Sequence, residues 1–340
     1  MALRGDRVTL AHGGGGSAMR DLIEELFTGV FEPDGMEDQA RLEAGALAEP
    51  GARLAFTTDS FVVSPVEFPG GDIGTLAVNG TVNDLAVGGA RPLWLSAAFI
   101  IEEGTDFALL RRIVASMKRE AERAGVRIVT GDTKVVGRGA ADRVFVTTSG
   151  VGVIRPGRDI AAVHIRPGDV AIVNGVLGDH GACILAARGD LALSSDLQSD
   201  CAGLGHLMDA VLAAAPGTKA ARDCTRGGLA SALNEMAEAA GVGIEIEETA
   251  LPLRDEVKGT CELLGLDPLY LANEGRLVVF VPEVQAEAAL AAMRAIETGT
   301  GATVIGRATE GPAGQVTMRT LIGGSRIVDM LVGEQLPRIC

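Results

Sequence analysis

The sequence predicts an α/β (α+β) protein with two domains, and three observations support this. Apolar runs with the length of strands alternate along the chain with segments of helical periodicity. The 340 residues exceed a single domain of roughly 100–200 residues. The triplet Arg-Pro-Gly occurs at 155–157 and again at 166–168, where Pro and Gly favour turns. We therefore expect a first domain over 1–155, a second α+β domain over 156–320, and a mobile tail over 321–340.

Each expected element follows from its local pattern. Helical periodicity is clearest after Thr105, where apolar residues recur at alternating spacings of four and three until Gly125, a typical helix stop. Similar segments run over 73–86, 227–240 and 283–297. Apolar runs predict strands, in chain order, at 53–58, 92–101, 126–130, 143–154, 170–174, 277–281 and 303–307.

Charge and hydropathy exclude several functional classes. The chain has 30 Lys and Arg against 45 Asp and Glu, a net charge of −15, which argues against sequence-independent binding of nucleic acid or anionic lipid. Charge-free stretches reach about eleven residues, as at 73–83 and 144–154, and a membrane span needs about 20. The first residues lack the apolar core of a signal peptide, so we expect a cytoplasmic protein.

Common nucleotide and hydrolase motifs are missing. No Gly-Lys dipeptide occurs, so there is no Walker A loop, and neither HExxH nor GxSxG is present. The segment GTGATV at 299–304 resembles a dinucleotide fingerprint, but Val304 stands where the third Gly belongs. A nucleotide would therefore bind to a less common scaffold.

The densest polar segment runs over 57–92. Asp59 comes at the expected end of a strand, and Asn79, Asn83 and Asp84 lie on a Gly-rich helix. Because Asn, Asp and Gly are poor helix formers, a helix that contains them is more typical of a site than of a core. An ordinary capped helix with a polar outer face is the alternative for any one of these residues, but for the cluster we favour a binding site.

Three further segments contain candidate ligands. In GDTKVVG (131–137), Asp132 is a candidate cation ligand and Lys134 a phosphate or carbonyl contact, although such a turn is more often simply solvated. In RDCTRGGL (222–229), Asp223 and Thr225 precede a Gly pair that opens a helix, where either an anion site or a plain N-cap is expected. The pattern leaves the role of Glu274, just before a Gly and a strand, open.

Near the N-terminus, Gly13, Gly14 and Gly15 follow His12 in a run whose amides could surround a phosphate. A flexible terminus is the default alternative. Well-separated Asp residues suggest Mg²⁺ held by a few carboxylates together with nucleotide phosphates.

The five cysteines contain no CxxC pair and are expected to be free thiols. Cys340 is the last residue printed, and a thiol on a mobile end can bring a covalent group into a site built elsewhere. The alternative is that its terminal position is accidental.

Together, HGGGG, TTDSFVVSP, FPGGDIG, NGTVNDLA, GDTKVV, TRGGL, ANEG and GEQLPRIC resemble the HypE family of carbamoyl dehydratases. That family is a branch of the PurM-like (AIR synthase-related) ATP-binding superfamily. The resemblance covers nearly the whole chain, and the terminal Cys is its most specific feature. It implies a PurM-like two-domain architecture whose N-terminal domains pair in a homodimer.

For function, the resemblance implies that Cys340 receives a carbamoyl group from the carbamoyltransferase HypF. ATP then drives dehydration of that group to a thiocyanate, and the cyano group passes to the HypC–HypD complex for the iron of [NiFe]-hydrogenase. The expected site has Cys340, Lys134 and Glu274 as catalytic groups, with Glu274 as the base. ATP is expected at Gly13, Gly14, Gly15, Asp59, Asn83, Asp84, Asp132, Asp223 and Thr225, with Mg²⁺ on Asp59, Asp84 and Asp223. Two alternatives stay open: an ATP-dependent kinase or synthetase acting on a free small molecule, and a non-catalytic thiol carrier.

Overall fold

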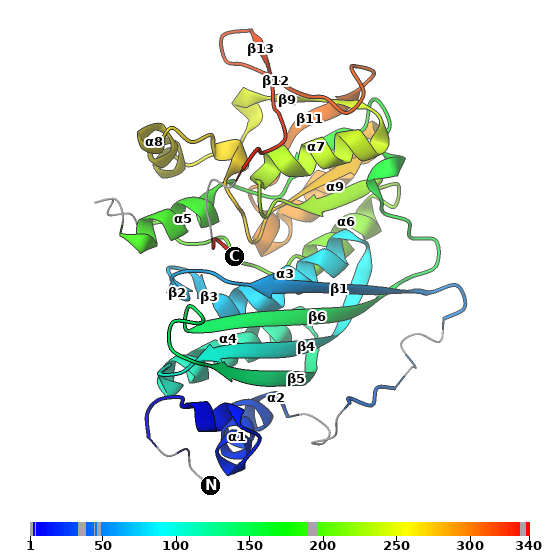
Figure 1. The fold of residues 1–340 in the computed structure, drawn as a ribbon. Coiled ribbons are helices and arrows are strands. Elements are labelled where there is room, and N and C mark those ends of the chain that lie inside the picture. The colour runs from blue at the N-terminus through cyan, green and yellow to red at the C-terminus, as the bar shows by residue number, and fades with distance from the viewer. Residues whose placement is uncertain are drawn as a thin grey trace. The chain divides into compact units, whose positions relative to one another are not determined.

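The computed structural model describes residues 3, 5–32, 39–43, 45, 49–189, 196–333 and 338–340 (Figure 1). The chain divides into two compact units. The first comprises Met1–Leu85, Ala90–Pro156 and Cys340, and the second comprises Ala86–Gly89 and Gly157–Ile339. Each unit combines a sheet with helices, so the expected α/β fold class is confirmed.

A four-stranded sheet forms the centre of the first unit, in the order β1-β6-β4-β5. Its strands are β1 (Arg53–Phe61), β4 (Ala90–Glu102), β5 (Arg127–Val136) and β6 (Val144–Ile154), and only β4 and β5 pair in parallel. The helix α3 (Ile73–Val87) packs on one face of this sheet, and α4 (Phe107–Ala124) packs on α3. The short elements of this unit are η1 (Leu10–Gly13), α1 (Ser17–Leu22), η2 (Ile23–Thr28), α2 (Gly29–Phe31), β2 (Glu67–Phe68) and β3 (Gly71–Asp72).

The second unit contains a seven-stranded sheet, in the order β13-β12-β9-β11-β7-β10-β8. Its central strands are buried on both faces: Val170 and Ile172 face one core, whereas Ala171 and Val173 face the other. This explains why these strands appear in the sequence as continuous apolar runs. The strands are β7 (Val170–Val173), β8 (Ala220–Asp223), β9 (Gly243–Glu247), β10 (Leu277–Val281), β11 (Thr303–Thr309), β12 (Val316–Arg319) and β13 (Ser325–Ile327).

Helices cover both faces of the second sheet. Residues of α7 (Gly228–Ala240) belong to one core, and residues of α6 (Gly205–Ala214) and α9 (Ala286–Arg294) belong to the other. The remaining helical elements are α5 (Asp179–Arg188), α8 (Asp255–Leu264), η4 (Ala162–His164), η5 (Glu248–Ala250), η6 (Pro268–Tyr270), η7 (Glu283–Gln285) and η8 (Glu297–Gly299). Within the described ranges, no helix is both long enough and apolar enough to cross a membrane.

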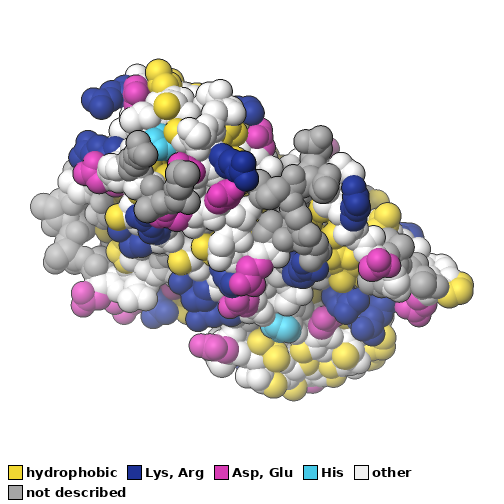
Figure 2. Space-filling model, turned by 90° about the horizontal axis from the view of Figure 1, so that it is seen from below, with side chains coloured by type: hydrophobic (Ala, Val, Ile, Leu, Met, Phe, Trp, Pro, Cys, Tyr) yellow, Lys and Arg dark blue, Asp and Glu magenta, His cyan; other side chains and the backbone are white. Residues whose placement is uncertain are grey.

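Charges of both signs mix on the surface. On the face that Figure 2 shows, Lys and Arg side chains lie interspersed among Asp and Glu side chains. Some exposed groups of opposite charge form ion pairs, such as Arg112 with Glu67 and Arg20 with Glu24. Such exposed pairs contribute little to stability, so the fold depends on the two sheets and their helices.

Some boundaries differ from the sequence prediction. β1 and β5 extend beyond their apolar runs, because main-chain pairing continues through polar residues. Asp59 and Asp132 therefore lie within strands, whereas the pattern predicted a strand end and a turn. In the expected tail over 321–340, β13 pairs with β12 and Val328 belongs to a core, so the first part of that range is folded. Residues 334–337 lie outside the described residues.

The glycines of α3 are explained by packing. A Cβ at Gly74 would lie 2.5 Å from the carbonyl oxygen of Ile113 in α4, and a Cβ at Gly80 would lie 2.9 Å from the ring of Phe61 in β1. Real side chains do not approach so closely, so these two glycines allow α3 to fit between the sheet and α4. The glycines that lower the helix propensity of α3 are thus required for packing and do not by themselves indicate a binding site.

We therefore expect Gly74→Ala to reduce the free energy of unfolding by about 1–3 kcal/mol, as for other overpacked cores. The matched control is Gly259→Ala in α8, where a new Cβ would meet nothing within 4 Å. The control should leave stability unchanged or raise it by up to about 1 kcal/mol, because Ala is the better helix former. Urea denaturation of the two variants measures both effects, and equal stabilities would contradict this account of α3.

Candidate functional site

In the first unit, Asp59 and Asp84 lie on the same side of the sheet. Thr57 and Asp59 alternate on the face of β1 that points toward α3, and the Thr57 hydroxyl donates a 2.8 Å hydrogen bond to Asp84 Oδ2. A Cβ at Gly80 would lie 3.9 Å from Asp59 Oδ2. The structure therefore brings the predicted carboxylates of β1 and α3 to one region.

Asn79 and Asn83 add buried amides to this region. Both side chains are about 2% exposed, as expected for a helix enclosed on nearly all sides. Among the described residues, Asn79 Nδ2 has no hydrogen-bond partner. A buried donor without a partner costs roughly 1–3 kcal/mol, which is the situation a bound ligand oxygen relieves.

Asp132 and Lys134 lie on the other face of the same sheet. Asp132 pairs with Ala98 and Lys134 with Ile100 across the β4–β5 ladder, on the face opposite the buried Phe99 and Ile101. Lys134 Nζ lies 3.2 Å from Asp132 Oδ2, and both side chains are more than half exposed. The two residues form a solvent-accessible ion pair, separate within this unit from the Asp59–Asp84 region.

The glycine run at the N-terminus is partly structured. Gly13 ends η1, and a Cβ there would lie 2.8 Å from the Cβ of Val135 in β5. The default expectation of a flexible terminus is therefore wrong at Gly13. A Cβ at Gly14 would make only ordinary contacts, while Gly15 adopts a positive φ with open space around it, so the backbone at these two residues remains accessible.

In the second unit, Asp223 ends β8, opposite Leu277 of β10, and Thr225 follows in the connection to α7. The alternative of an N-cap by the Thr225 side chain is wrong: the N-cap of α7 is Gly227, with φ near 76° and no side-chain cap. The Thr225 carbonyl instead accepts a hydrogen bond from the Gly228 amide.

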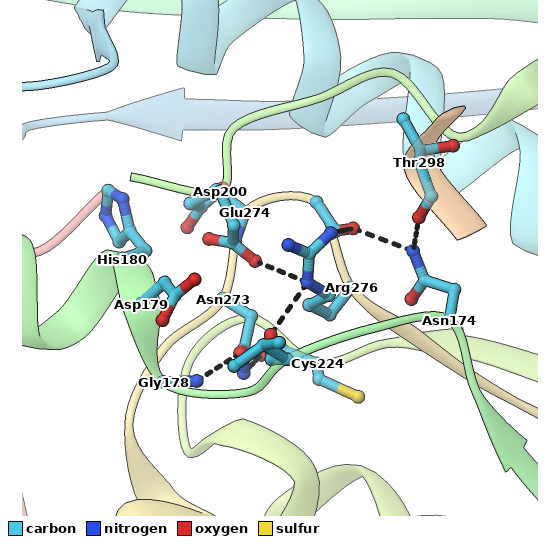
Figure 3. A network of polar contacts seen from close by, with 12 residues as sticks. Asn174, Gly178, Asp179, His180, Asp200, Cys224, Asn273, Glu274, Arg276 and Thr298 are labelled. Carbon is cyan, nitrogen blue, oxygen red and sulfur yellow. Dashed lines mark hydrogen bonds and ion pairs between the residues drawn. The ribbon is translucent and has the colours of Figure 1, made fainter. Parts of the chain in front are cut away.

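Glu274 is one of several buried charged groups in the second unit (Figure 3). It is only 3% exposed, although the sequence pattern gave no indication that this Glu is buried. Its backbone amide donates to Asp200 Oδ1 at 3.0 Å, and Asp200 Oδ2 lies 3.5 Å from Arg276 Nε. Asn273 fixes the neighbouring backbone, since it accepts from the Gly178 amide and donates to the Cys224 carbonyl.

Two members of this buried group, Asp179 and His180, begin α5 and were not predicted. Burial raises the pKa of the Asp179 carboxyl, which the 3.0 Å contact with Arg254 only partly offsets. Burial also lowers the pKa of His180, with Asp200 acting in the opposite direction. The Gly-Asp pair after β7 resembles that in GDTK, and it is the local sequence feature that could have indicated Asp179 as a site residue. The sequence around Asp200 contains no such feature.

The cysteines differ in accessibility. Burial raises the pKa of Cys183 and Cys261 to about 11 and raises that of Cys224 further, so these thiols stay protonated at neutral pH. Cys201 and Cys340 are half-buried. The Cys340 carbonyl accepts a hydrogen bond from the Val62 amide at 3.2 Å.

Within the described ranges, no three His, Cys, Asp or Glu side chains cluster as a preformed metal centre. Asp59 and Asp84 belong to the first unit and Asp223 to the second. Carboxylate oxygens suit Mg²⁺, which usually takes one or two protein carboxylates together with phosphate oxygens and water. Within the first unit, Asp59 and Asp84 supply the carboxylate oxygens that suit a magnesium ion bound together with a nucleotide.

Two family models match the chain. Residues 37–154 match the N-terminal domain of AIR synthase related protein, and residues 166–319 match its C-terminal domain. The chain is 80% identical to the carbamoyl dehydratase HypE of Rhodobacter capsulatus, over the full length of both chains.

Solved structures agree with this match. The crystal structure of the hydrogenase maturation protein HypE in complex with ATP is 47% identical, covers 97% of this chain and 99% of its own, and superposes with a TM-score of 0.92. In a HypE–HypF complex, the matching chain is 45% identical, with a TM-score of 0.80 and coverage of 91% and 99%. The chain belongs to the HypE family of carbamoyl dehydratases, within the AIR synthase related proteins.

Proposed function

We propose that this chain is an ATP-dependent carbamoyl dehydratase of hydrogenase maturation. It converts a carboxamide on the thiol of Cys340 into a thiocyanate, which supplies the cyanide ligand for the iron of [NiFe]-hydrogenase. The observation that carries this proposal is the 80% identity with a carbamoyl dehydratase HypE, which extends over every part of both chains. Free thiols, as all described cysteines are, suit a reaction in the cytoplasm.

The need for ATP follows from the leaving group. Loss of water from S–C(=O)–NH₂ would expel a poor leaving group. Transfer of the γ-phosphoryl group to the carbamoyl oxygen makes phosphate the leaving group, and removal of both N–H protons then completes the C≡N bond. The products are the S-cyano group, ADP and phosphate, so one water is removed from the carbamoyl group and consumed in ATP hydrolysis.

We assign nucleotide binding to Asp59, Asn83 and Asp84 together with Gly13, Gly14, Gly15, Asp223 and Thr225. The geometry within the first unit does not support the expected role of Asp132 in the same site, because Asp132 lies on the opposite face of the sheet. The carboxylates of Asp59 and Asp84, beside the buried donor Asn79 Nδ2, support a phosphate-binding role for this region of the first unit. Mg²⁺ on Asp59, Asp84 and Asp223 would offset the charge that develops on the transferring phosphoryl group.

Glu274 is the proposed base. It projects from the loop before β10, and its backbone is fixed by the hydrogen bond to Asp200. A buried carboxylate of this kind can accept an N–H proton as phosphate leaves. Lys134 is assigned to the carbonyl oxygen or the phosphate as a proposal; its side chain is more than half exposed and pairs with Asp132, on the sheet face opposite Asp59 and Asp84.

The partners follow the same assignment. HypF delivers the carbamoyl group, and the HypC–HypD complex receives the cyano group.

The sheet face opposite α3 supports the proposed homodimer. On this face, Leu54 and Phe56 of β1 are 62% and 71% exposed, and Ile100 of β4 is also exposed. Exposed apolar side chains on one sheet face suit an interface between copies of the chain.

Intact-mass analysis of the carbamoylated protein tests the chemistry. With ATP and Mg²⁺, we expect the loss of one water confined to the C-terminal peptide, and no loss without ATP. Cys340→Ser should abolish both carbamoylation and the loss. A carbamoylated chain that keeps its mass under ATP would overturn the dehydratase assignment. ATP-dependent turnover of a free small molecule by Cys340→Ser would favour a kinase or synthetase.

Glu274→Gln tests the base. The change keeps the side-chain volume, and we expect the rate of water loss to fall by roughly 10²–10⁴-fold because a positioned base is removed. ATP affinity should stay within about twofold. The matched control is Glu283→Gln, an exposed carboxylate of the same unit that pairs with Arg307. Full dehydration activity in Glu274→Gln would exclude the base role.

Asp84→Asn tests the nucleotide site. We expect at least a tenfold loss of Mg²⁺–ATP affinity in calorimetric titration, since a charge-assisted contact is worth about 1.5–3 kcal/mol. Glu122→Gln on the exposed side of α4 is the control and should bind as the unmodified chain does. Unchanged affinity in Asp84→Asn would remove this carboxylate from the proposed site.

Phe56→Glu tests the homodimer. A charge in the exposed sheet face should convert a dimer to a monomer in light scattering, because an unpaired charge is costly in an apolar interface. Val284→Glu introduces the same charge at another apolar residue, which is 92% exposed in the second unit, and should leave the mass unchanged. A dimer that persists in Phe56→Glu would locate the interface elsewhere.

A further inference from the structure

His180 is a buried histidine whose two ring nitrogens both have partners. It is fully buried in the first turn of α5, with Nε2 2.8 Å from the carbonyl oxygen of Ile339 and Nδ1 2.8 Å from the hydroxyl of Ser199. A carbonyl oxygen can only accept, so Nε2 must carry a proton. Because burial lowers the pKa of His180, the ring is neutral and Nδ1 accepts from Ser199. One tautomer is thereby selected, and it donates to the peptide carbonyl that precedes Cys340.

A second residue of the same helix makes a parallel contact. Arg188, at the end of α5, donates from Nη2 to the carbonyl oxygen of Arg338 at 2.9 Å. Two successive carbonyls near the C-terminus are thus bound by side chains of one helix. The Ile339 side chain is only 5% exposed, so the terminal segment is also held by apolar burial.

The backbone of this segment has a defined conformation. Arg338 has φ near 53°, in the left-handed region that non-glycine residues rarely adopt. Such a conformation persists where surrounding contacts fix it. The hydrogen bonds to the carbonyls of Arg338 and Ile339 are contacts of that kind.

The position of α5 is itself fixed. Gly178, its N-cap, has φ near 82° and donates to Asn273 Oδ1, and a Cβ at Gly181 would lie 3.1 Å from Leu271. The segment that contains Glu274 therefore also sets the start of α5 and the ring of His180. Figure 3 shows His180 beside Asp179, on the side of the network where Asp200 and Glu274 gather.

We propose that His180 and Arg188 form a docking site for the backbone of Arg338 and Ile339, and that this site positions the thiol of Cys340. The Ile339 carbonyl is held by His180, and the Cys340 carbonyl also accepts a hydrogen bond from the Val62 amide, so few backbone torsions remain to move the sulfur. Both hydrogen bonds from α5 are to main-chain carbonyls, so they recognise the path of the backbone, while burial of the Ile339 side chain adds an apolar contact. His180 and Arg188 are positioning residues. The importance of His180 and Arg188 for dehydration rests on the proposed function. The docking of the C-terminal segment itself does not depend on that function.

The test measures how fast iodoacetamide alkylates Cys340 in the full-length chain without ATP or a carbamoyl group. The readout is the mass of the peptide Gln335–Cys340, which a Glu-specific protease releases by cleavage after Glu334. His180→Leu removes the donor at similar volume, and we expect alkylation about fivefold faster, the effect of losing one ordinary hydrogen bond. His180→Gln, whose amide can still donate to the carbonyl, should restore a rate near that of the unmodified chain.

Two controls separate docking from general loosening. His164→Leu changes a surface histidine that pairs with Asp159 and should leave the rate unchanged. Alkylation of the buried Cys261 in α8 reports local unfolding and should not accelerate with Cys340. If His180→Leu does not fold, Arg188→Met gives the same test through the Arg338 carbonyl.

An unchanged Cys340 rate in the Leu and Met variants would overturn the docking site. So would equal acceleration in His180→Leu and His180→Gln, or parallel acceleration of Cys261. Because the assay needs no dehydration, its failure is distinguishable from failure of the proposed function, which the intact-mass experiment detects separately.

Discussion

The close approach of α3 to its neighbours is the constraint on which the first unit depends. Gly74 faces the backbone of α4 and Gly80 faces Phe61 of β1, and neither position has room for a Cβ. Because α3 is enclosed, its polar residues cannot turn to solvent, and Asn79 and Asn83 are buried. The same packing that removes the helix from water therefore places Asp84 beside Thr57 of β1.

The second unit contains a group of charged side chains that are removed from water. Asp179, Asp200, Glu274 and Arg276 lie where charges are costly, and they are held by backbone amides and ion pairs. This burial changes two pKa values: the pKa of the Asp179 carboxyl rises, and the pKa of His180 falls. Such a group is more typical of a functional region than of a core, since apolar residues would fill the same volume at lower cost.

Much of the architecture could be predicted from local patterns. The long apolar runs at 92–101, 143–154 and 277–281 became β4, β6 and β10, and the amphipathic stretch after Thr105 became α4. The short strands β8, β12 and β13 were not predicted, because short strands acquire their structure from the neighbours with which they pair. Asp179 and Asp200 were missed for a similar reason: their positions in sequence are ordinary, and only their burial is unusual.

The sequence by itself determined the fold class, the family and the residue types available for chemistry, because these depend on periodicity and on motifs read in order along the chain. The tertiary structure decided which of those residues meet. It joined Asp84 to Thr57, placed Asp132 and Lys134 on the opposite sheet face, and buried Glu274. It also brought Ile339 to His180, 159 positions away. Contacts between distant residues and the burial of a charge depend on how elements pack, and that information is not contained in any local stretch of sequence.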